Sequence, residues 1–241
     1  MDIVEHILSL VNKEKTFNSL SNIKANSFLT ALGVDHSDKS ASYLCIGKSL
    51  VPFGLVSAGY KNVSSINCLC DEGLETKYGI HYISETIEQL VANGTKFDYV
   101  IAPDEWLTYS STEAEQLKKI EQASKLANIG FYTTLKDYKN LNAAHRFFQE
   151  PFQIKTDTGD CFVVRKRDWE PNDKQAWTDK SYIIHNDQLI VGDQYKCRTM
   201  YFKQLAKFIT DAGAKSYQVE KKIMYKPLFS KSFEYIIYVT F

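Results

Sequence analysis

Two carboxylates and two aromatic side chains follow the apolar run KFDYVIA (96–102) at close spacing. The run is typical of a buried strand, and open α/β sheets bind ligands beyond the carboxyl ends of their strands. Asp104 or Glu105 would accept a proton from an attacking amine or hydroxyl group. Trp106 or Tyr109 would stack against an acceptor or a cation. The structural alternative is that Trp106 packs against the next helix, whose amino terminus the two acids favour.

The elements that must position this segment alternate between strand and helix. Short apolar runs predict strands at 41–47, 63–70, 79–83, 96–102 and 130–135. Apolar residues at helical spacing predict helices at 49–60, 85–93 and 112–127. Ser84 is expected to cap the second of these helices, and Thr112 with Glu115 forms a capping box for the third. Since parallel strands need crossover connections, the alternation indicates a doubly wound α/β sheet.

The pattern changes after residue 139. Turn signals at 157–160 and at Asn186–Asp187 predict antiparallel hairpins within 152–169 and 181–201. A helix is expected at about 199–212 and ends at Gly213. Two long strands follow at 216–225 and 232–241, and the short loop between them can join them only as an antiparallel pair. Two further helices are expected at 2–12 and 28–32. We therefore expect an N-terminal helical lead-in (1–39), an α/β domain (40–139 and 199–241) and a β-hairpin insertion (140–198).

Composition excludes several classes of protein. The 241 residues carry 29 Lys+Arg and 29 Asp+Glu, so the chain lacks the basic balance of a generic nucleic-acid binder. No apolar run reaches the roughly 18–20 residues of a membrane span, and acids within 1–15 argue against a signal peptide. The five cysteines lack C-x-x-C spacing and further metal ligands. We expect reduced, buried thiols, no metal site, no nucleic-acid or membrane partner and a cytoplasmic location.

Four charged residues outside the first segment receive structural interpretations. Asp98 lies early in a buried strand and is expected to anchor it by hydrogen bonds rather than to catalyse a reaction. Arg165, Lys166 and Arg167 are consecutive, with no aromatic residue between them, and a solvated strand edge explains them.

The order of all these segments resembles that of class I S-adenosylmethionine-dependent methyltransferases, from about Ser40 to Phe241. The family's first strand, cofactor loop, helix and second strand are similar to YLCIGKSLVPFGLVSAGYKNVSSIN, and its fourth strand and following loop to FDYVIAPDEWLTY. Its next helix and strand resemble TEAEQLKKIEQASKLANIGFYTTLKDY, and its last helix resembles YFKQLAKFITDAGAKSYQV. The resemblance implies a Rossmann-like seven-stranded sheet with an antiparallel last strand, S-adenosylmethionine as cofactor, and an insertion that caps the substrate pocket.

The resemblance also assigns positions around the cofactor. The family's first loop runs acid-x-Gly-x-Gly-x-Gly, and Gly47 matches its first glycine. Cys45 occupies the acid position, and Ser49 and Val51 occupy the other two glycine positions. Gly54 follows in the same segment as a possible displaced glycine.

The remaining family positions lie after the second, third and fourth strands. Asn67 stands where an acid binds the ribose hydroxyls, and Ser84 stands where an acid commonly meets adenine. Ala102, Pro103 and Trp106 fall in the loop that flanks the reactive methyl group. The cofactor-binding candidates are therefore Gly47, Ser49, Asn67, Ser84, Ala102, Pro103 and Trp106, and the catalytic candidates are Asp104, Glu105 and Tyr109.

Two functions follow from these residues. The first is methyl transfer from S-adenosylmethionine to a small-molecule or peptide-like acceptor. The second is a methyltransferase-fold binding or assembly module without cofactor, in which Phe53 or Lys48 fills the cofactor volume. A different Rossmann-like nucleotide enzyme is disfavoured, because the chain has neither Gly-x-Gly-x-x-Gly nor a P-loop.

Overall fold

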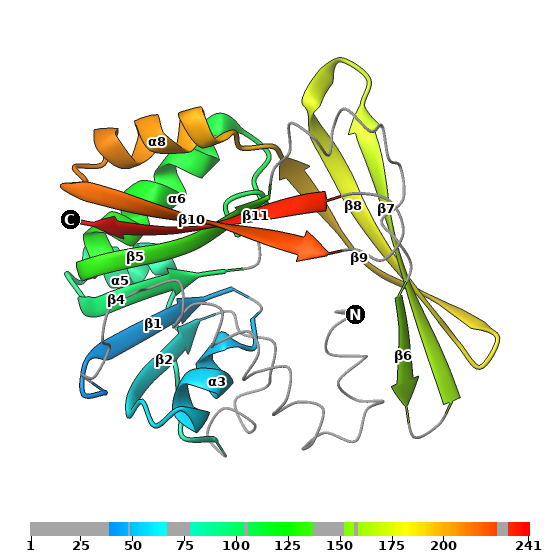
Figure 1. Ribbon diagram of the computed structural model, residues 1–241, viewed down its shortest axis with the longest axis horizontal. Helices are drawn as coiled ribbons and strands as arrows, with labels where there is room; N and C mark the ends of the chain where they lie inside the picture. Colours follow the sequence, from blue (N-terminus) through cyan, green and yellow to red (C-terminus); the bar gives the residue numbers. More distant parts are fainter. Residues whose placement is uncertain are drawn as a thin grey trace.

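A seven-stranded sheet and a separate four-stranded sheet organise the molecule (Figure 1). The structure, a computed structural model, describes residues 39–47, 49–66, 78–103, 106–136, 152–156, 159–225 and 231–241. The helices expected at 2–12 and 28–32 lie outside the described residues.

The larger sheet has the strand order that the resemblance implies. Its strands are β1 (Ser42–Ile46), β2 (Asn62–Ile66), β3 (His81–Tyr82), β4 (Phe97–Ala102), β5 (Ala127–Lys136), β10 (Ser216–Tyr225) and β11 (Lys231–Thr240). They are arranged β10-β11-β5-β4-β1-β2-β3. β11 pairs antiparallel with both β5 and β10, whereas β1 through β5 pair parallel. The predicted doubly wound sheet with an antiparallel last strand is confirmed.

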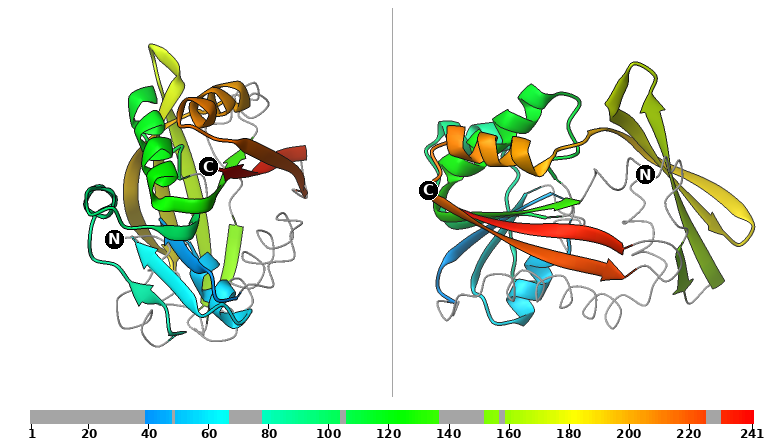
Figure 2. Two further views of the ribbon diagram at one scale, coloured as in Figure 1. Left: turned by 90° about the vertical axis from the view of Figure 1, so that its left-hand side faces the viewer. Right: turned by 45° about the horizontal axis from the view of Figure 1, so that its top comes forward.

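Helices cover both faces of this sheet (Figure 2). They are α3 (Val51–Ser57), α5 (Ile87–Ala92), α6 (Glu113–Leu126) and α8 (Phe202–Asp211). α5, α6 and α8 bury their apolar residues in one cluster with the sheet, and α3 contributes to a second cluster on the opposite face. The result is a three-layer α/β/α core.

Local signals set the helix ends, with two corrections. The Thr112 hydroxyl accepts a hydrogen bond of 3.2 Å from the Glu115 amide, so Thr112 caps α6 as predicted. The reciprocal half of the predicted capping box does not form, because the Glu115 carboxylate accepts from the Ser111 amide instead. The predicted cap of α5 is wrong, because Thr86, not Ser84, accepts the bond from the Gln89 amide. Thr86 and Gln89 form a complete capping box, which outcompetes a serine two residues earlier.

Asp98 anchors the start of β4, as predicted. Its carboxylate accepts hydrogen bonds from the amide and the hydroxyl of Ser42, at 2.8 and 2.9 Å. The Asp98 amide in turn donates to the Ser42 hydroxyl at 2.9 Å. These bonds join the first residue of β1 to β4 and fix the pairing of the two central strands.

The smaller sheet is an antiparallel meander in the order β6-β7-β8-β9. Its strands are β6 (Phe152–Thr156), β7 (Gly159–Glu170), β8 (Asp173–His185) and β9 (Gln188–Arg198). The predicted hairpin at Asn186–Asp187 is confirmed, with φ of 49° and 59° in the turn. The sheet stands opposite the end of the larger sheet to which β10 points, which is also the carboxyl end of β1, β4 and β5 (Figures 1 and 2).

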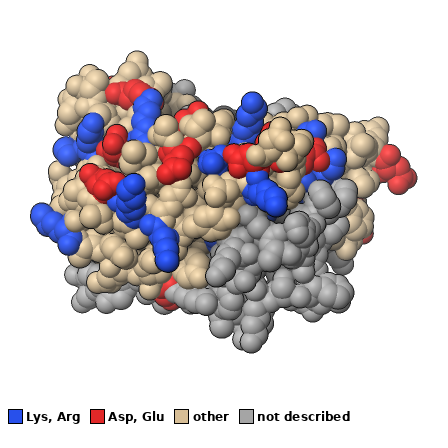
Figure 3. Space-filling model, turned by 90° about the horizontal axis from the view of Figure 1, so that it is seen from above, with Lys and Arg blue, Asp and Glu red and all other residues tan. Residues whose placement is uncertain are grey.

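Two features of the described residues bear on partners. Lys and Arg side chains are interspersed with Asp and Glu on the face shown in Figure 3, without a region of one sign. One such contact joins Lys118 and Glu88 at 3.0 Å, with both side chains more than half exposed. Within the described residues, no helix has the length and apolarity that crossing a membrane requires.

Candidate functional site

Two loops meet at the centre of the larger sheet. β1 and β4 are neighbours, and the chain leaves β1 toward α3 on one face and β4 toward α6 on the other. Such a point, where successive connections diverge, is where open α/β sheets form a ligand crevice. A Cβ added to Gly47, after β1, would lie 3.4 Å from Cδ1 of Trp106, after β4. The structure therefore brings these two candidates side by side.

Gly47 adopts a backbone conformation that favours glycine. Its φ is +88°, in the left-handed region where other L-residues are strained. Its amide donates a 3.0 Å hydrogen bond to the carbonyl oxygen of Ile66 at the end of β2. The chain therefore turns sharply at the carboxyl end of β1 while remaining tied to β2.

Side chains at the other two glycine positions of the family lie inside the protein. Ser49 and Val51 are 2% and 0% exposed. The Ser49 hydroxyl accepts a 3.2 Å hydrogen bond from the Val51 amide at the start of α3. Val51 packs in the core cluster beneath α3, together with the buried Cys45. Gly54 lies within α3 and not in the loop, so it does not serve as a displaced loop glycine.

A turn begins the loop after β4. The carbonyl oxygen of Ala102 accepts a 3.0 Å hydrogen bond from the hydroxyl of Thr133 on β5. Pro103 is buried, and its carbonyl oxygen accepts a 3.2 Å bond from the Trp106 amide. These bonds direct Trp106 back toward Gly47.

Three of the predicted site residues, Asn67, Asp104 and Glu105, lie outside the described residues. Ser84 is exposed and follows β3, which lies two strands away from β1 at the edge of the sheet.

Lys119 of α6 holds the loop after β4. Its Nζ donates hydrogen bonds to the carbonyl oxygens of Trp106, at 2.9 Å, and Tyr109, at 2.5 Å. The same nitrogen lies 5.0 Å from the centre of the Trp106 ring, a cation–π distance. Burial lowers the pKa of Lys119 to about 8, although the Glu115 carboxylate acts in the opposite direction. Lys119 thus ties the backbone and the ring of the loop to the helix that follows it.

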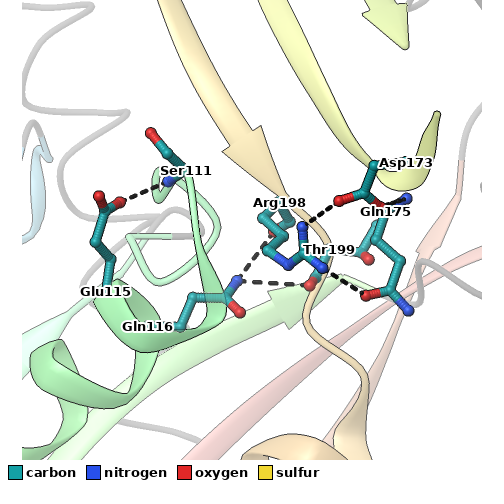
Figure 4. Close-up of polar contacts among 7 residues, drawn as sticks. All are labelled: Ser111, Glu115, Gln116, Asp173, Gln175, Arg198 and Thr199. Atoms are coloured by element: carbon teal, nitrogen blue, oxygen red, sulfur yellow. Dashed lines mark hydrogen bonds and ion pairs between the residues drawn. The ribbon is translucent and has the colours of Figure 1, made fainter. Parts of the chain in front are cut away.

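Gln116, one turn earlier on α6, joins the loop to the end of β9 (Figure 4). Its Nε2 donates to the carbonyl oxygens of Leu107 and Arg198, at 3.3 and 3.1 Å. The Arg198 amide donates to the carbonyl oxygen of Thr108 at 2.9 Å. The end of β9 in the insertion sheet is therefore hydrogen-bonded directly to the loop after β4.

The Arg198 side chain extends this joint to β8. It forms an ion pair of 2.5 Å with Asp173 and donates a 3.2 Å hydrogen bond to the Gln175 side-chain oxygen (Figure 4). Nearby, the edge of the Tyr109 ring packs against the Tyr195 ring of β9, with centroids 5.6 Å apart. Tyr109 is 38% exposed, so a ligand can reach it.

Arg165, Lys166 and Arg167 do not form a solvated strand edge, and that prediction is wrong. β7 lies between β6 and β8, and its side chains alternate between two faces. Arg167 is 6% exposed, lies 3.5 Å from Asp179, and stacks at 5.0 Å over the Trp177 ring. Lys166 faces the other way and forms an ion pair with Asp168 at 2.7 Å. Sequence analysis missed that β7 is a central strand with one face buried.

Gln116 and Lys119 were also missed, although one signal was available. Gln116 shares the buried stripe of α6 with Ile120 and Ala123, at spacings of four and seven residues. A polar residue on an apolar helical stripe needs a hydrogen-bond partner in the fold. The described residues contain no group of three or more metal-ligating side chains.

Known structures of similar shape were found, whereas no family model and no curated protein matches this sequence. A methyltransferase of Clostridium acetobutylicum ATCC 824, described as S-adenosylmethionine-dependent, superposes with a TM-score of 0.62 at 14% identity, over 88% of this chain and 91% of that one. The CcbJ methyltransferase of Streptomyces caelestis gives 0.57 at 16% identity, over 83% of both chains.

A third structure is an amino pentose methyltransferase of Micromonospora echinaspora with S-adenosylmethionine bound. It superposes with a TM-score of 0.55 at 10% identity, over 100% of this chain and 97% of that one. Identities this low establish the arrangement of the chain and not its chemistry. Strand order, antiparallel last strand and superposition agree, and the chain has the fold of class I S-adenosylmethionine-dependent methyltransferases.

Proposed function

We propose that the protein transfers a methyl group from S-adenosylmethionine to a small-molecule or peptide-like acceptor. The observation that carries this proposal is the contact between Gly47 and Trp106 at the point where the connections of β1 and β4 diverge. Open α/β sheets bind ligands at such a point, and the two loops supply a sharp glycine turn and an aromatic ring there.

The described part of the first loop fits the cofactor despite its missing glycines. The reason for glycine in such a loop is close approach of the backbone to the ligand. Ser49 and Val51 turn their side chains into the core, so neither change adds a side chain beside Gly47. Gly47 keeps the conformation that the turn needs. Contacts to the cofactor are proposed for Gly47, Ser49, Asn67, Ser84, Ala102, Pro103 and Trp106.

Methyl transfer requires mainly that nucleophile, methyl group and leaving sulfur are aligned. When bound, the cofactor supplies an electrophilic methyl group on a sulfonium cation. Trp106 would face that cation, and Tyr109 would stack on the acceptor. Asp104 or Glu105 would accept the proton that the nucleophile loses.

The alternative is a binding or assembly module without cofactor. It is motivated by Cys45, Ser49, Val51 and Asn67 at positions where the family has acids or glycines. That hypothesis expects Phe53 or Lys48 to fill the cofactor volume. Phe53 instead packs in the core beneath α3, with its ring 5.4 Å from that of Tyr78, and Lys48 lies outside the described residues.

Calorimetric titration with S-adenosylmethionine and S-adenosylhomocysteine tests the proposal. We expect micromolar binding to the wild-type protein and a loss of at least about 100-fold in Gly47→Trp. Gly213→Trp is the matched control, because Gly213 has the same φ of +88° and open space around it, but lies after α8. Both positions have the same φ, so a loss confined to Gly47→Trp is not explained by backbone strain at the substituted glycine.

Three outcomes would overturn the proposal. Absence of heat with the well-folded wild-type protein would favour the binding module. Unchanged affinity in Gly47→Trp would remove the β1 loop from the site. Equal loss in Gly213→Trp would show that strain, and not the loop, explains the effect.

A further inference from the structure

The inner face of the insertion sheet carries two rows of polar residues between apolar ones. The register places Arg167 opposite Asp179, and Arg165 opposite Ser181, on β7 and β8. The next row on the same face is Val163 with Ile183, and both are fully buried. Because side chains alternate along a strand, all of these residues point to one side of the sheet.

The two arginines of this face differ in their partners. Arg167 has a carboxylate opposite it, within 3.5 Å, and an aromatic ring beneath it. Arg165 has only the Ser181 hydroxyl opposite it. The Nε atoms of Arg165, Arg167 and Arg198 are all buried without a hydrogen-bond partner, but of these three only Arg165 takes part in no ion pair of the described residues.

This difference is unusual for the molecule. The structure describes three arginines, and the other two, Arg167 and Arg198, each pair with an aspartate. A partly buried positive charge without a counter-charge costs folding free energy that a bound anion would recover. Arg165 therefore provides charge and directed donors that the described part of the fold leaves unused.

The position of the sheet indicates what could use them. The insertion sheet stands across from the carboxyl ends of β1, β4 and β5, where Gly47 and Trp106 meet (Figures 1 and 2). Its Trp169 and Trp177 pack into the same cluster as α6 and α8, which directs the inner face toward the larger sheet. The register puts Arg165 on the same face of the sheet as these two tryptophans.

We propose that Arg165, together with Ser181, binds an anionic group of the methyl acceptor, a carboxylate or a phosphate. The guanidinium presents paired N–H donors that match two oxygens of either group, and the serine hydroxyl adds a further donor. The proposal rests on the proposed methyltransferase function and names the chemical class of its acceptor.

The test follows the Nε–Hε resonance of Arg165 by NMR while the full chain is titrated with sodium benzoate, phenyl phosphate or benzyl alcohol. The first two probes distinguish a carboxylate from a phosphate, and the neutral alcohol controls for ring binding. Each titration is run with and without S-adenosylhomocysteine, so that failure of the cofactor to bind is seen separately from failure of the anion to bind.

The expected result is saturable movement of the resonance with at least one anion and none with benzyl alcohol. Arg165→Gln should lower the affinity for that anion at least about tenfold, because a charge-assisted bidentate contact is lost. In this variant, the affinity is measured from the backbone resonances of β7 and β8. Lys166→Gln, one residue away on the outer face, is the matched control and should change affinity less than about twofold. Arg165→Gln should not lower the melting temperature, since no ion pair among the described residues is lost.

Other results would overturn the proposal. Arg165 would bind no anion if neither anion moved the resonance, or if Arg165→Gln bound the anion with the affinity of the wild-type protein. If S-adenosylhomocysteine alone moves it and excludes both anions, Arg165 binds the cofactor carboxylate and not the acceptor. A fall in melting temperature without ligand would indicate a structural role.

Discussion

The loops after β1 and β4 meet at one point of the sheet but are held there by different parts of the molecule. The β1 loop is fixed by its own backbone and by side chains that enter the core beneath α3, namely Ser49 and Val51. The β4 loop is fixed from outside, by Lys119 and Gln116 of α6 and by the end of β9. One loop is thus part of the α/β core, and the other is shared between that core and the insertion.

The difference explains how the two halves of a site can vary separately. In the β1 loop, residues at glycine positions can change if the new side chains are accepted by the core, because the backbone is what faces a ligand. In the β4 loop, the position of Trp106 and Tyr109 depends on contacts with α6 and β9. Under the proposed function, a change in the insertion would move Tyr109 on the acceptor side and leave the β1 loop in place.

The largest expected effect comes from restoring a family glycine, in Val51→Gly. If the Val51 side chain serves the core, its loss should destabilise the protein by about 3 kcal/mol, from a cavity and from glycine in a helix. It should not improve affinity for S-adenosylmethionine. Urea unfolding and calorimetry measure the two quantities. Tighter cofactor binding in Val51→Gly would show that Val51 obstructs the ligand, and the contrast between the loops would fail.

A smaller effect is expected for Gln116→Leu, which fills the same space without the amide. The carbonyl oxygen of Arg198 would lose the donor that Gln116 provides, whereas that of Leu107 would keep the Ser110 hydroxyl, at a total cost of about 1–2 kcal/mol. Cofactor affinity should stay within about twofold, because Gln116 bonds to Leu107 and Arg198 and not to any of the proposed cofactor contacts. Gln122→Leu, on the same helix beside Glu88, is the control for a general effect of leucine on α6. The claim that Gln116 joins the β4 loop to β9 would be contradicted if both variants lost the same cofactor affinity and Gln116→Leu were as stable as the wild-type protein.

Lys119→Met tests the same loop through its pH dependence. The pKa of Lys119 lies near 8 in the folded protein and near its ordinary, higher value when unfolded. Between these values the unfolded chain binds more protons, so the stability of the wild-type protein rises with pH relative to the variant. From about pH 7.5 to about pH 9 the gain should be about 1 kcal/mol. A difference in unfolding free energy that stays constant over this range would mean that Lys119 is solvated.

Sequence patterns predicted the parts of this arrangement that depend on neighbouring residues. The Thr112 cap and the Asn186–Asp187 hairpin follow from signals within a few positions and are confirmed. The strand order came from the family resemblance, since no local pattern fixes which strands pair. Serine is a good helix cap, but the complete capping box at Thr86 is stronger than Ser84 two residues earlier.

What the sequence did not show are contacts between residues far apart. Gln116 and Arg198 are 82 positions apart, and no spacing rule connects them. The pairing of Arg167 with Asp179 required knowing that β7 is central and that β8 begins at Asp173. The missed residues belong to the joint between core and insertion, because that joint is made by side chains from three separate elements.

The smallest effect is expected for Tyr195→Leu, which removes the ring that packs against Tyr109. An edge-to-face pair contributes about 0.5–1.5 kcal/mol, and leucine restores part of the packing, so the loss in stability should be about 0.5 kcal/mol. The variant nevertheless separates the two loops cleanly. Because Tyr109 is partly exposed and proposed to contact the acceptor, the change should alter acceptor affinity or turnover while cofactor affinity stays constant. If cofactor affinity falls instead, the insertion also positions the cofactor half, and the two loops form one unit.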